Sequence, residues 1–500
     1  MEPRTLTTVS GDTVSLAIQD QMYIDGDFVD SGEHFSTYHP ATGERLADVP
    51  VATAEQVDEA VTAATSASHE WRRVSVAERG RRVGSLADAL EAARENLVNL
   101  DVADNGSSIG RLKHDIEKGA NKLRYFAGLG TELKGETIPT VESELNVTKR
   151  EPYGAVAAII PFNHPFMFTA NKIGPAVMAG NGIVLKPSEY TPLSALYVAH
   201  VVDELDVFPD GLINVVTGAG EVGASLVGHD ESRLVTMIGS ANTGKKVMEA
   251  AASHLAPVIL ELGGKNPAIV FPDADIERTA EGAVGAMSLP WQGQSCQSGS
   301  RLLVHEDVYD DIVPRVVEGF ESVVVGDPFE ESTTMGSIVS QPQYERVLDY
   351  IETAKEEGAT LLTGGSVIER LGDGCFVEPT AFEVDPGMTI ATEEIFGPVL
   401  SVMPWSDYDE MIELANAVDY GLTASIWTND LRTAHKTADR IEAGYVWVNK
   451  HGGSAIGTPF GGFKESGIGR NGNKDELLAH TRIKNLNISL DGELSPLADD

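Results

Sequence analysis

Cys296 is the residue of this chain whose surroundings most favour chemistry. It lies in the segment PWQGQSCQSGS, between glycines and small polar residues that let backbone amides approach a reacting atom. A structural thiol usually lies in an apolar run, and core packing is the ordinary expectation for a lone cysteine. The polar flank reverses that expectation here and predicts a nucleophile. Cys375, in DGCFVEP, keeps the structural interpretation.

Two polar residues near predicted strand ends complete a candidate catalytic set. Glu261 interrupts the apolar strand of PVILELGGK, where burial would raise its pKa into the range of a general base; an ion pair with Lys265 or another cation is the alternative. Asn163 lies between prolines in IIPFNHPF, and its amide can donate to a developing oxyanion. His164 is interpreted as a packing or supporting residue, because the 12 histidines show no metal-ligand spacing. No metal site is predicted.

Two glycine motifs match phosphate-binding loops in part. Gly218, Gly220 and Gly223 satisfy G-x-G-x-x-G, but the acidic residue expected about 20 positions later is missing, which favours a tight turn over a pyrophosphate site. In GSANTGKK, which begins at Gly239, Lys246 replaces the hydroxyl that binds magnesium in an NTPase. A strand end followed by a helix still offers free N–H groups to a dinucleotide pyrophosphate.

The elements that position these residues follow from the hydrophobic pattern. Capping boxes at Thr53 and Ser75 predict helices. From Leu145 onward apolar strands alternate with helices, which is typical of parallel sheets joined by crossovers, and two α/β sheet domains are expected. A hairpin is predicted at MYIDGDFVDSG, and regular structure is expected to begin there.

Two segments are predicted as strands without evident partners in the chain. ETIPTVESELNVTKREP is expected to form a long polar hairpin, and TRIKNLNISL a lone strand near the C-terminus. Such strands often pair with another subunit.

Composition limits the classes of function. The 500 residues are 42% hydrophobic and 23% charged, a globular balance that excludes disorder. Asp and Glu number 76 against 37 Lys and Arg, and the net charge of −39 argues against nucleic-acid binding. The same charge suggests the hypothesis of a halophile-like protein from a salt-rich cytosol.

Cysteine usage and hydropathy predict a cytoplasmic protein. The chain has 2 cysteines, far apart in sequence, so neither a disulfide framework nor a cysteine zinc site is supported. The longest apolar stretch, residues 155–162, is shorter than the ~20 residues that span a bilayer, and the N-terminus has no signal-peptide core. We therefore expect no membrane anchor.

Ordered motifs between about Met22 and Leu486 resemble those of the aldehyde dehydrogenase superfamily. They are PFNHPF, GNGIVLKPSEYTP, MIGSANTGKK, LELGGKNP, GQSCQSG, EEIFGPV, DYGLTASIWT, WVN and PFGGFKESGIGR. The resemblance implies that Cys296 attacks an aldehyde and that the Asn163 amide and the Cys296 N–H hold the oxyanion. Hydride then passes to NAD, and Glu261 activates the water that releases the acid.

The resemblance also implies where the cofactor binds. Glu189 favours NAD, with NADP as the alternative, because a carboxylate that accepts from ribose hydroxyls repels a 2′-phosphate. The implied cofactor contacts are Pro161, Phe162, Lys186, Ser188, Glu189, Gly239, Ser240, Leu262, Glu394 and Phe396.

The fold implied by the resemblance is an α/β, aldehyde dehydrogenase-like fold with two parallel-sheet domains and a small β arm. A Rossmann-like NAD-binding domain is expected over residues 1–129 and 153–264, and a catalytic domain over 265–479. Residues 130–152 and 480–500 are expected to form an oligomerisation arm and C-terminal tail, so that the chain builds a homodimer or homotetramer.

Three departures from the family pattern concern the substrate side. The triplet F-N-H replaces the commoner W-N-F, and Asn471 stands where many relatives have Glu, which puts a proton-relay role at that position in doubt. The third is the short segment from Lys450 to Thr458, in a region that helps to shape the substrate mouth in the family. Lys450 and His451 of this segment are interpreted as solvated loop charges, the alternative being a preference for an acidic aldehyde.

Two other functions stay open beside oxidation of an aldehyde to an acid. A CoA-acylating semialdehyde dehydrogenase is the first, although such relatives usually lack the base that Glu261 supplies. A non-catalytic NAD-binding member is the second, against which the joint presence of Cys296, Asn163 and Glu261 argues. The substrate depends on loop residues that the motifs do not encode.

Overall fold

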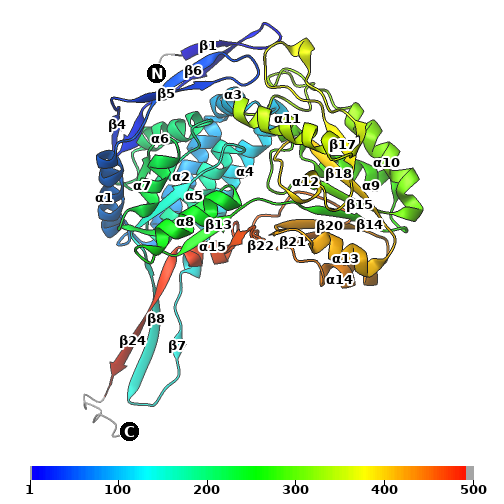
Figure 1. Cartoon of the computed structure of the whole chain (residues 1–500). Helices are drawn as coiled ribbons and strands as arrows, with labels where there is room; N and C mark the ends of the chain where they lie inside the picture. The colour runs from blue at the N-terminus through cyan, green and yellow to red at the C-terminus, as the bar shows by residue number, and fades with distance from the viewer. Residues whose placement is uncertain (1–2, 491–500) are drawn as a thin grey trace.

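The computed structural model of the chain describes residues 3–490, which build two large sheets and a projecting arm (Figure 1). The strands of the first sheet are β3 (Met22–Ile24), β4 (Asp27–Val29), β9 (Ala155–Ile159), β10 (Gly182–Lys186), β11 (Ile213–Val215), β12 (Ser232–Ile238), β13 (Val258–Glu261) and β23 (Gly467–Ile468). They lie in the order β23-β13-β12-β9-β10-β11-β3-β4, and the five from β13 to β11 are parallel.

Helices of the N-terminal half pack around this sheet. They are α1 (Ala54–Trp71), α2 (Val76–Ala92), α3 (Arg94–Asn105), α4 (Ile109–Gly128), α5 (Pro165–Ala179), α6 (Leu193–Leu205), α7 (Gly220–Gly228) and α8 (Ala241–Ala252), joined near the C-terminus by α15 (Lys474–Ala479). The predicted capping box closes at α1, where Thr53 accepts from the Gln56 N–H and the Gln56 side chain accepts from the Thr53 N–H. Ser75 caps α2 by accepting from the Glu78 N–H, but the Glu78 side chain binds Arg81 and Arg82, so the box predicted there is only half formed.

The second sheet has seven strands: β14 (Pro267–Val270), β15 (Arg301–His305), β16 (Thr360–Thr363), β17 (Thr380–Glu383), β18 (Val399–Trp405), β20 (Thr423–Trp427) and β21 (Tyr445–Val448). Their order is β16-β17-β18-β15-β14-β20-β21, and only β16 is antiparallel to its neighbour. The accompanying helices are α9 (Ile276–Ala286), α10 (Glu306–Glu321), α11 (Gln341–Glu356), α12 (Thr389–Thr392), α13 (Tyr408–Asn416) and α14 (Leu431–Ala438). Two α/β sheets were expected, and two are found.

One short strand links the two halves of the chain. β23 lies within the range predicted for the catalytic domain, yet it pairs with β13 in the first sheet, with Glu261 opposite Gly467. The backbone of Gly467 has φ +134°, and a Cβ there would collide with the Leu260 carbonyl, so glycine is required for this pairing. The register therefore fixes the end of β13, where Glu261 stands.

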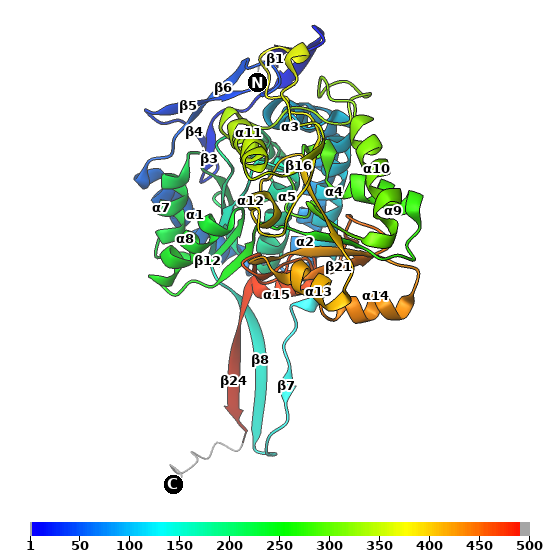
Figure 2. The same cartoon turned by 45° about the vertical axis from the view of Figure 1, so that its right-hand side comes forward.

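The segments 136–152 and 481–490 form the arm that extends from the body (Figures 1 and 2). β24 (Thr481–Ser489) pairs along its whole length with β8 (Glu144–Pro152), and β7 (Thr137–Ile138) covers the other side of β8. The expectation that these strands lack a partner in the chain was wrong, because they pair with each other across more than 300 residues. The outer edge of β24 is open within the described residues. Residues 491–500 of the predicted tail lie outside them.

The expectation that regular structure begins at Met22 was also wrong. β1 (Pro3–Thr7) and β2 (Thr13–Ala17) form an antiparallel hairpin that precedes it. Leu6 and Leu16 are buried from this hairpin, so the alternation of apolar and polar residues was present in the polar N-terminal stretch.

The remaining short elements complete the described chain. They are β5 (His34–Tyr38), β6 (Arg45–Pro50), β19 (Tyr420–Gly421), β22 (Phe463–Lys464) and the 3₁₀ turns η1 (Gly130–Glu132), η2 (Leu289–Trp291) and η3 (Glu369–Leu371). β5 pairs with β6 and β19 with β22.

Candidate active site

The candidate nucleophile Cys296 lies on a loop between η2 and β15. Asn266 holds this loop, because its amide nitrogen donates to the carbonyls of Cys296 and Ser298, both at 2.8 Å. Its amide oxygen accepts from the Thr423 N–H at 3.0 Å. Two strands of the second sheet thereby fix the loop that carries the thiol.

Glu261 faces the Cys296 thiol from the end of β13. Its side chain is 2% exposed, and burial raises the pKa of Glu261 to about 7, while the thiol that donates to it and the ammonium groups of Lys172 and Lys122 oppose that rise. Burial and the Glu261 charge raise the pKa of the Cys296 thiol well above its usual range. A carboxyl that can take its proton therefore stands beside the thiol.

The alternative of a Glu261–Lys265 ion pair is wrong. Lys265 is buried, and the carboxylates that act on it are Glu394 and Glu393; its amino group has no hydrogen-bond partner within the described residues. The carboxyl of Glu261 is thus not consumed by a structural ion pair with that lysine.

Asn163 follows β9 and is 2% exposed. Its amide nitrogen donates to the Gln294 carbonyl at 2.9 Å, so the side chain is fixed to the loop that carries Cys296. An amide nitrogen has two hydrogens, and this bond uses one of them. The other stays available for an oxyanion.

His164 supports the site from behind. Its Nδ1 donates to the Asp115 carboxylate at 2.6 Å, and the Trp291 indole donates to the same oxygen at 3.0 Å. All three side chains are buried. This arrangement agrees with the supporting role predicted for His164. His164 stands where the commoner triplet W-N-F has Phe, and the Asn163 amide still reaches the Gln294 carbonyl.

The residues predicted to contact a cofactor follow the carboxyl ends of neighbouring parallel strands. Pro161 and Phe162 follow β9, Lys186 ends β10, Gly239 and Ser240 follow β12, and Leu262 follows β13. The carboxyl ends of parallel strands meet at one edge of a sheet, which is where ligands bind in such folds. The sheet therefore brings these residues to one side.

Lys186 is held by carbonyl groups rather than by Glu189. Its ammonium donates to the carbonyls of Pro187 at 2.8 Å and Gly218 at 2.7 Å, whereas the Glu189 carboxylate is 3.9 Å away. Gly218 has φ +141° and packs against Val222 of α7, so the partial fingerprint is a tight turn that also anchors Lys186. Desolvation lowers the pKa of Lys186.

Ser188 and the start of α8 use their side chains for backbone hydrogen bonds. The Ser188 hydroxyl accepts from the Tyr190 N–H at 3.2 Å, and the Ser240 hydroxyl caps α8 through the Thr243 N–H at 3.3 Å. Leu262 packs close to Gly244 in the first turn of α8. The N-terminus of α8 is thus positioned beside the strand ends, with a dipole that favours an anion.

Glu394 and Phe396 lie between α12 and β18. Glu394 accepts from the Gly264 N–H at 2.9 Å, and burial raises the pKa of Glu394 to about 7. Phe396 adopts φ +59° and meets the ring of Phe162 edge to face at 5.6 Å. The second sheet therefore contributes a carboxyl and a ring to the edge of the first.

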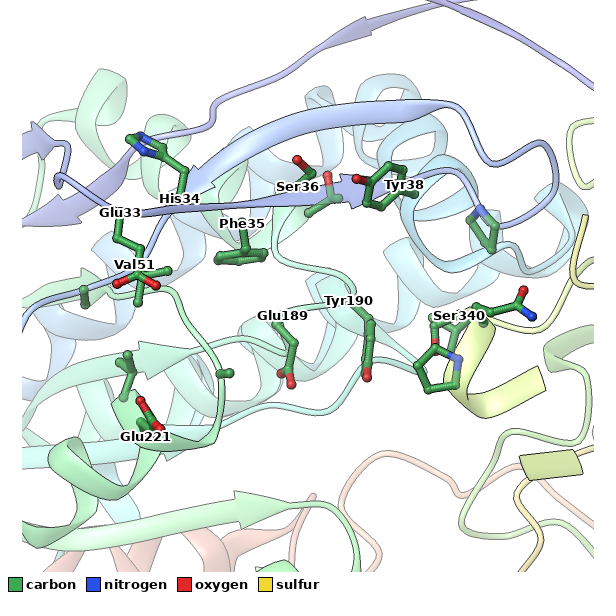
Figure 3. A pocket seen from close by; sticks show the side chains of 18 of the residues that line it. Glu33, His34, Phe35, Ser36, Tyr38, Val51, Glu189, Tyr190, Glu221 and Ser340 are labelled. Carbon is green, nitrogen blue, oxygen red and sulfur yellow. The ribbon is translucent and has the colours of Figure 1, made fainter. Parts of the chain in front are cut away.

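A large pocket lies beside Glu189 (Figure 3). Its volume is about 860 Å³, within the range of small-molecule and cofactor sites. Figure 3 shows Glu189 and Tyr190 between Glu221 and Ser340, with Phe35 on the strand opposite. Of the ten predicted cofactor contacts, Glu189 alone lines this pocket, which extends from it under the β5 hairpin.

A second, narrower pocket of about 120 Å³ reaches Cys296 and Glu261. Side chains from α4 and α5 line it together with the segment 453–460. His451 does not line this pocket. It lies against the ring of Trp447, and its Nε2 donates to the Gln297 carbonyl at 2.7 Å, so its interpretation as a solvated charge was wrong; Lys450 is exposed.

Several residues near this pocket were not singled out from the sequence. Lys172 donates to Asn471 at 3.3 Å and faces the Glu476 carboxylate at 4.0 Å. A buried carboxylate is therefore present near position 471, although that position itself carries Asn in place of the commoner Glu. Asn266 and Asp115 were missed as well. Each is a common polar residue whose role depends on contacts with distant segments, and the available signal for Asn266 was its place in the motif LELGGKNP.

Residues 3–490 contain no group of three or more His, Cys, Asp or Glu side chains placed to hold a metal ion. Within the same residues, no helix combines the length and apolar character needed to cross a membrane.

Comparison with known proteins identifies the family. The model of the aldehyde dehydrogenase family matches residues 28–486 of this chain. DhaS of Bacillus subtilis (strain 168), which bears a provisional aldehyde dehydrogenase name, is 43% identical over 478 residues, which are 94% of this chain and 96% of DhaS.

Solved structures agree with this match. The NAD+ complex of an aldehyde dehydrogenase from Bacillus cereus has a TM-score of 0.92 at 42% identity, over 94% of this chain and 97% of that one. PnpE from Pseudomonas sp. WBC-3, also solved with NAD, has a TM-score of 0.93 at 39% identity, over 96% of this chain and 100% of PnpE. The expected α/β fold is confirmed, and the chain belongs to the aldehyde dehydrogenase family.

Proposed function

We propose that this protein oxidises an aldehyde to the carboxylic acid with NAD as hydride acceptor, through covalent intermediates on Cys296. The observation that carries the proposal is the meeting of three groups at one loop: the Cys296 thiol, the Glu261 carboxyl in contact with it, and the Asn163 amide fixed to the Gln294 carbonyl. A nucleophile, a base and an oxyanion donor are the groups that acyl chemistry on a thiol needs.

The first half of the reaction forms a bond to sulfur. Glu261 takes the thiol proton, and the Cys296 sulfur attacks the aldehyde carbon. The carbonyl oxygen becomes an oxyanion, to which the free N–H of the Asn163 amide and the Cys296 backbone N–H donate. When bound, NAD accepts the hydride that leaves the same carbon. A thioester to Cys296 results.

The second half breaks the bond to sulfur. After the thiol proton has passed from Glu261 to solvent, the Glu261 carboxylate takes a proton from water, the hydroxide attacks the thioester carbon, and the Cys296 thiolate leaves as the acid is released. Protonated Glu261 then returns a proton to the sulfur. Because burial raises the pKa of Glu261 to about 7, its carboxylate can accept protons near neutral pH. The same residue can serve both halves, since its carboxyl contacts the sulfur.

The residues at the sheet edge fit a dinucleotide. The capped N-terminus of α8 offers N–H groups for a pyrophosphate, and the rings of Phe162 and Phe396 face each other beside Glu394. Glu189 and Glu221 make the large pocket acidic, which favours an unphosphorylated ribose and hence NAD over NADP. Two related proteins were solved with this dinucleotide.

The arm supports a homodimer or homotetramer. The open edge of β24 exposes Ile483 and Ile488, with exposed fractions of 64% and 42%, and a strand edge is a template for pairing. Light scattering of the purified chain measures the assembly, and a monomeric mass would contradict this part of the proposal.

The test of the main proposal is NADH formation by the purified full-length protein. The assay uses NAD or NADP, a panel of aliphatic, aromatic, hydroxylated and carboxylated aldehydes, and reactions with and without CoA, in high and low salt. CoA-independent NADH formation that disappears in Cys296→Ala is expected. Strict dependence on CoA would favour an acylating enzyme instead, and bound NAD without turnover on any aldehyde would favour a binding protein.

A further inference from the structure

One face of α4 is lined with cationic side chains. Arg111, His114, Lys118 and Lys122 follow one another at intervals of three and four residues, which places them on the same side of a helix. All four line the narrow pocket that reaches Cys296. Successive turns of an α-helix are about 5.4 Å apart, so the four residues form a line along the pocket.

This cationic line runs from the surface toward the base. Arg111 and His114 are exposed, Lys118 and Lys122 are half-buried, and Lys172 on α5 is 1% exposed. Lys122 and Lys172 both act electrostatically on Glu261. Arg111 at the outer end lies 4.5 Å from the centre of the Trp291 ring. The line therefore leads from solvent to the reacting groups.

Three of these cations form no ion pair in the described part of the chain. Within residues 3–490, no carboxylate forms an ion pair with Arg111, Lys118 or Lys122, although 20 ion pairs are formed elsewhere. Lys113 provides the contrast. It lies on the same helix, outside the pocket, and pairs with Glu331.

The carboxylates that face the pocket are engaged elsewhere. Asp115 accepts from His164 and Trp291, and Glu476 accepts from the Gly472 N–H and faces Lys172. Glu261 contacts the Cys296 thiol. None of the three forms an ion pair with an α4 cation, although Asp115 acts electrostatically on Lys118, and Glu476 and Glu261 act on Lys122.

Leaving like charges side by side is unusual in a chain of net charge −39. Burial and the neighbouring charges of Lys118 and Lys172 lower the pKa of Lys122 to about 8, while Glu476 and Glu261 oppose that fall. An anion bound beside Lys122 would favour its charged form.

We infer that the substrate aldehyde carries a carboxylate at the end distant from its carbonyl group, bound by Lys118 with Arg111 and Lys122 on either side. The inference rests on the proposed function, because it assigns the substrate class of the same site. A pocket of about 120 Å³ is small for a ligand site and favours a short ω-oxo acid. Charge-assisted hydrogen bonds from ammonium and guanidinium groups are the interactions that recognise such a group.

The test compares succinic semialdehyde with its methyl ester, which has the same chain without the charge. The ratio of their kcat/KM values is expected to favour the acid by at least about tenfold, since a hydrogen bond to a charged group is worth that much. Lys118→Met should lower this ratio by about tenfold, and Lys118→Glu should invert it. Lys113→Met is the matched control and should leave the ratio within about twofold.

Each result supports or overturns the inference. Equal use of acid and ester by the native protein, or an unchanged ratio in Lys118→Met and Arg111→Gln, overturns it while oxidation of the ester preserves the proposed function. A stronger preference for an aldehyde that carries a phosphate also overturns it. If neither compound nor any aldehyde of the wider panel yields NADH, both this inference and the proposed function are contradicted. Thermal melting checks that the variants fold. If the Lys118 variants do not fold, Arg111→Gln replaces them in the test, because Arg111 is exposed.

Discussion

The two pockets of this protein differ in size and in charge. The pocket beside Glu189 has a volume of about 860 Å³, and its charged lining is mostly acidic, with Glu33, Glu221 and Asp373 beside it. The pocket that reaches Cys296 has about 120 Å³ and is lined by Arg111 and three lysines. One protein thus presents carboxylates to one ligand and cations to the other.

The two pockets also draw on different segments of the chain. Glu189 of the motif GNGIVLKPSEYTP lines the large pocket, and Cys296 of GQSCQSG lines the narrow one. Three of the cations in the narrow pocket, Arg111, Lys118 and Lys122, come from α4, which carries none of the quoted motifs.

Removing the proposed nucleophile should distinguish the functions of the two pockets most sharply. Cys296→Ala should lower NADH formation by at least about 10³-fold, because the covalent route is lost, while NAD binding stays within about twofold. Steady-state assays and calorimetric titration with NAD measure the two effects. Steady turnover in this variant would contradict the covalent mechanism.

Removing the base should uncouple the two halves of the reaction. Glu261→Gln is expected to slow steady turnover by about 10²-fold, because water is no longer activated at the thioester. Stopped-flow measurement and mass spectrometry of the trapped acyl-enzyme follow the halves separately. Full hydrolysis in this variant would assign the base elsewhere.

The pKa of Glu261 also gives the native enzyme a pH dependence. Since this pKa is raised to about 7, the proton-accepting carboxylate becomes more abundant as pH rises, and hydrolysis should accelerate between about pH 6 and pH 8. The slope should disappear in Glu261→Gln. A native rate that falls across this interval would contradict the assignment.

A change in the large pocket should alter cofactor choice without altering aldehyde choice. Glu189→Gln removes the carboxylate that opposes a 2′-phosphate, so the ratio of kcat/KM for NADP to that for NAD should rise by about tenfold. The acid-to-ester ratio is the control and should not move. An unchanged cofactor ratio would mean that Glu189 does not face the ribose.

The smallest effect is expected at the loop beside the narrow pocket. Lys450→Ala removes an exposed charge that does not line the pocket, so kcat/KM for succinic semialdehyde should change by less than about twofold. A loss as large as that expected for Lys118→Met would transfer substrate recognition from α4 to this loop.

Local signals singled out the candidate catalytic set in the sequence. A thiol among glycines, a carboxylate inside an apolar strand and an amide between prolines each conflict with ordinary packing, and the structure brings Cys296, Glu261 and Asn163 to one loop. The alternating strands and helices likewise predicted both sheets.

Features that depend on distant partners were not predictable in the same way. β24 and β8 pair across most of the chain, and no local pattern names a strand's partner. Asn266 acts through bonds to the Cys296 and Ser298 carbonyls. The cationic line of α4 is different. Its spacing of three and four residues is visible in the sequence, but only the structure shows that this face of the helix lines the pocket that reaches Cys296.

The uneven distribution of charge has a consequence for encounter rates. A net charge of −39 repels both an anionic aldehyde and a dinucleotide from the body of the protein, while Arg111 and the lysines attract an anion only at close range. Screening shortens the reach of repulsion to about 8 Å at physiological ionic strength and about 3 Å in molar salt. Added salt should therefore speed the diffusional approach of anions to this enzyme, the opposite of the behaviour of proteins that steer ligands by long-range attraction.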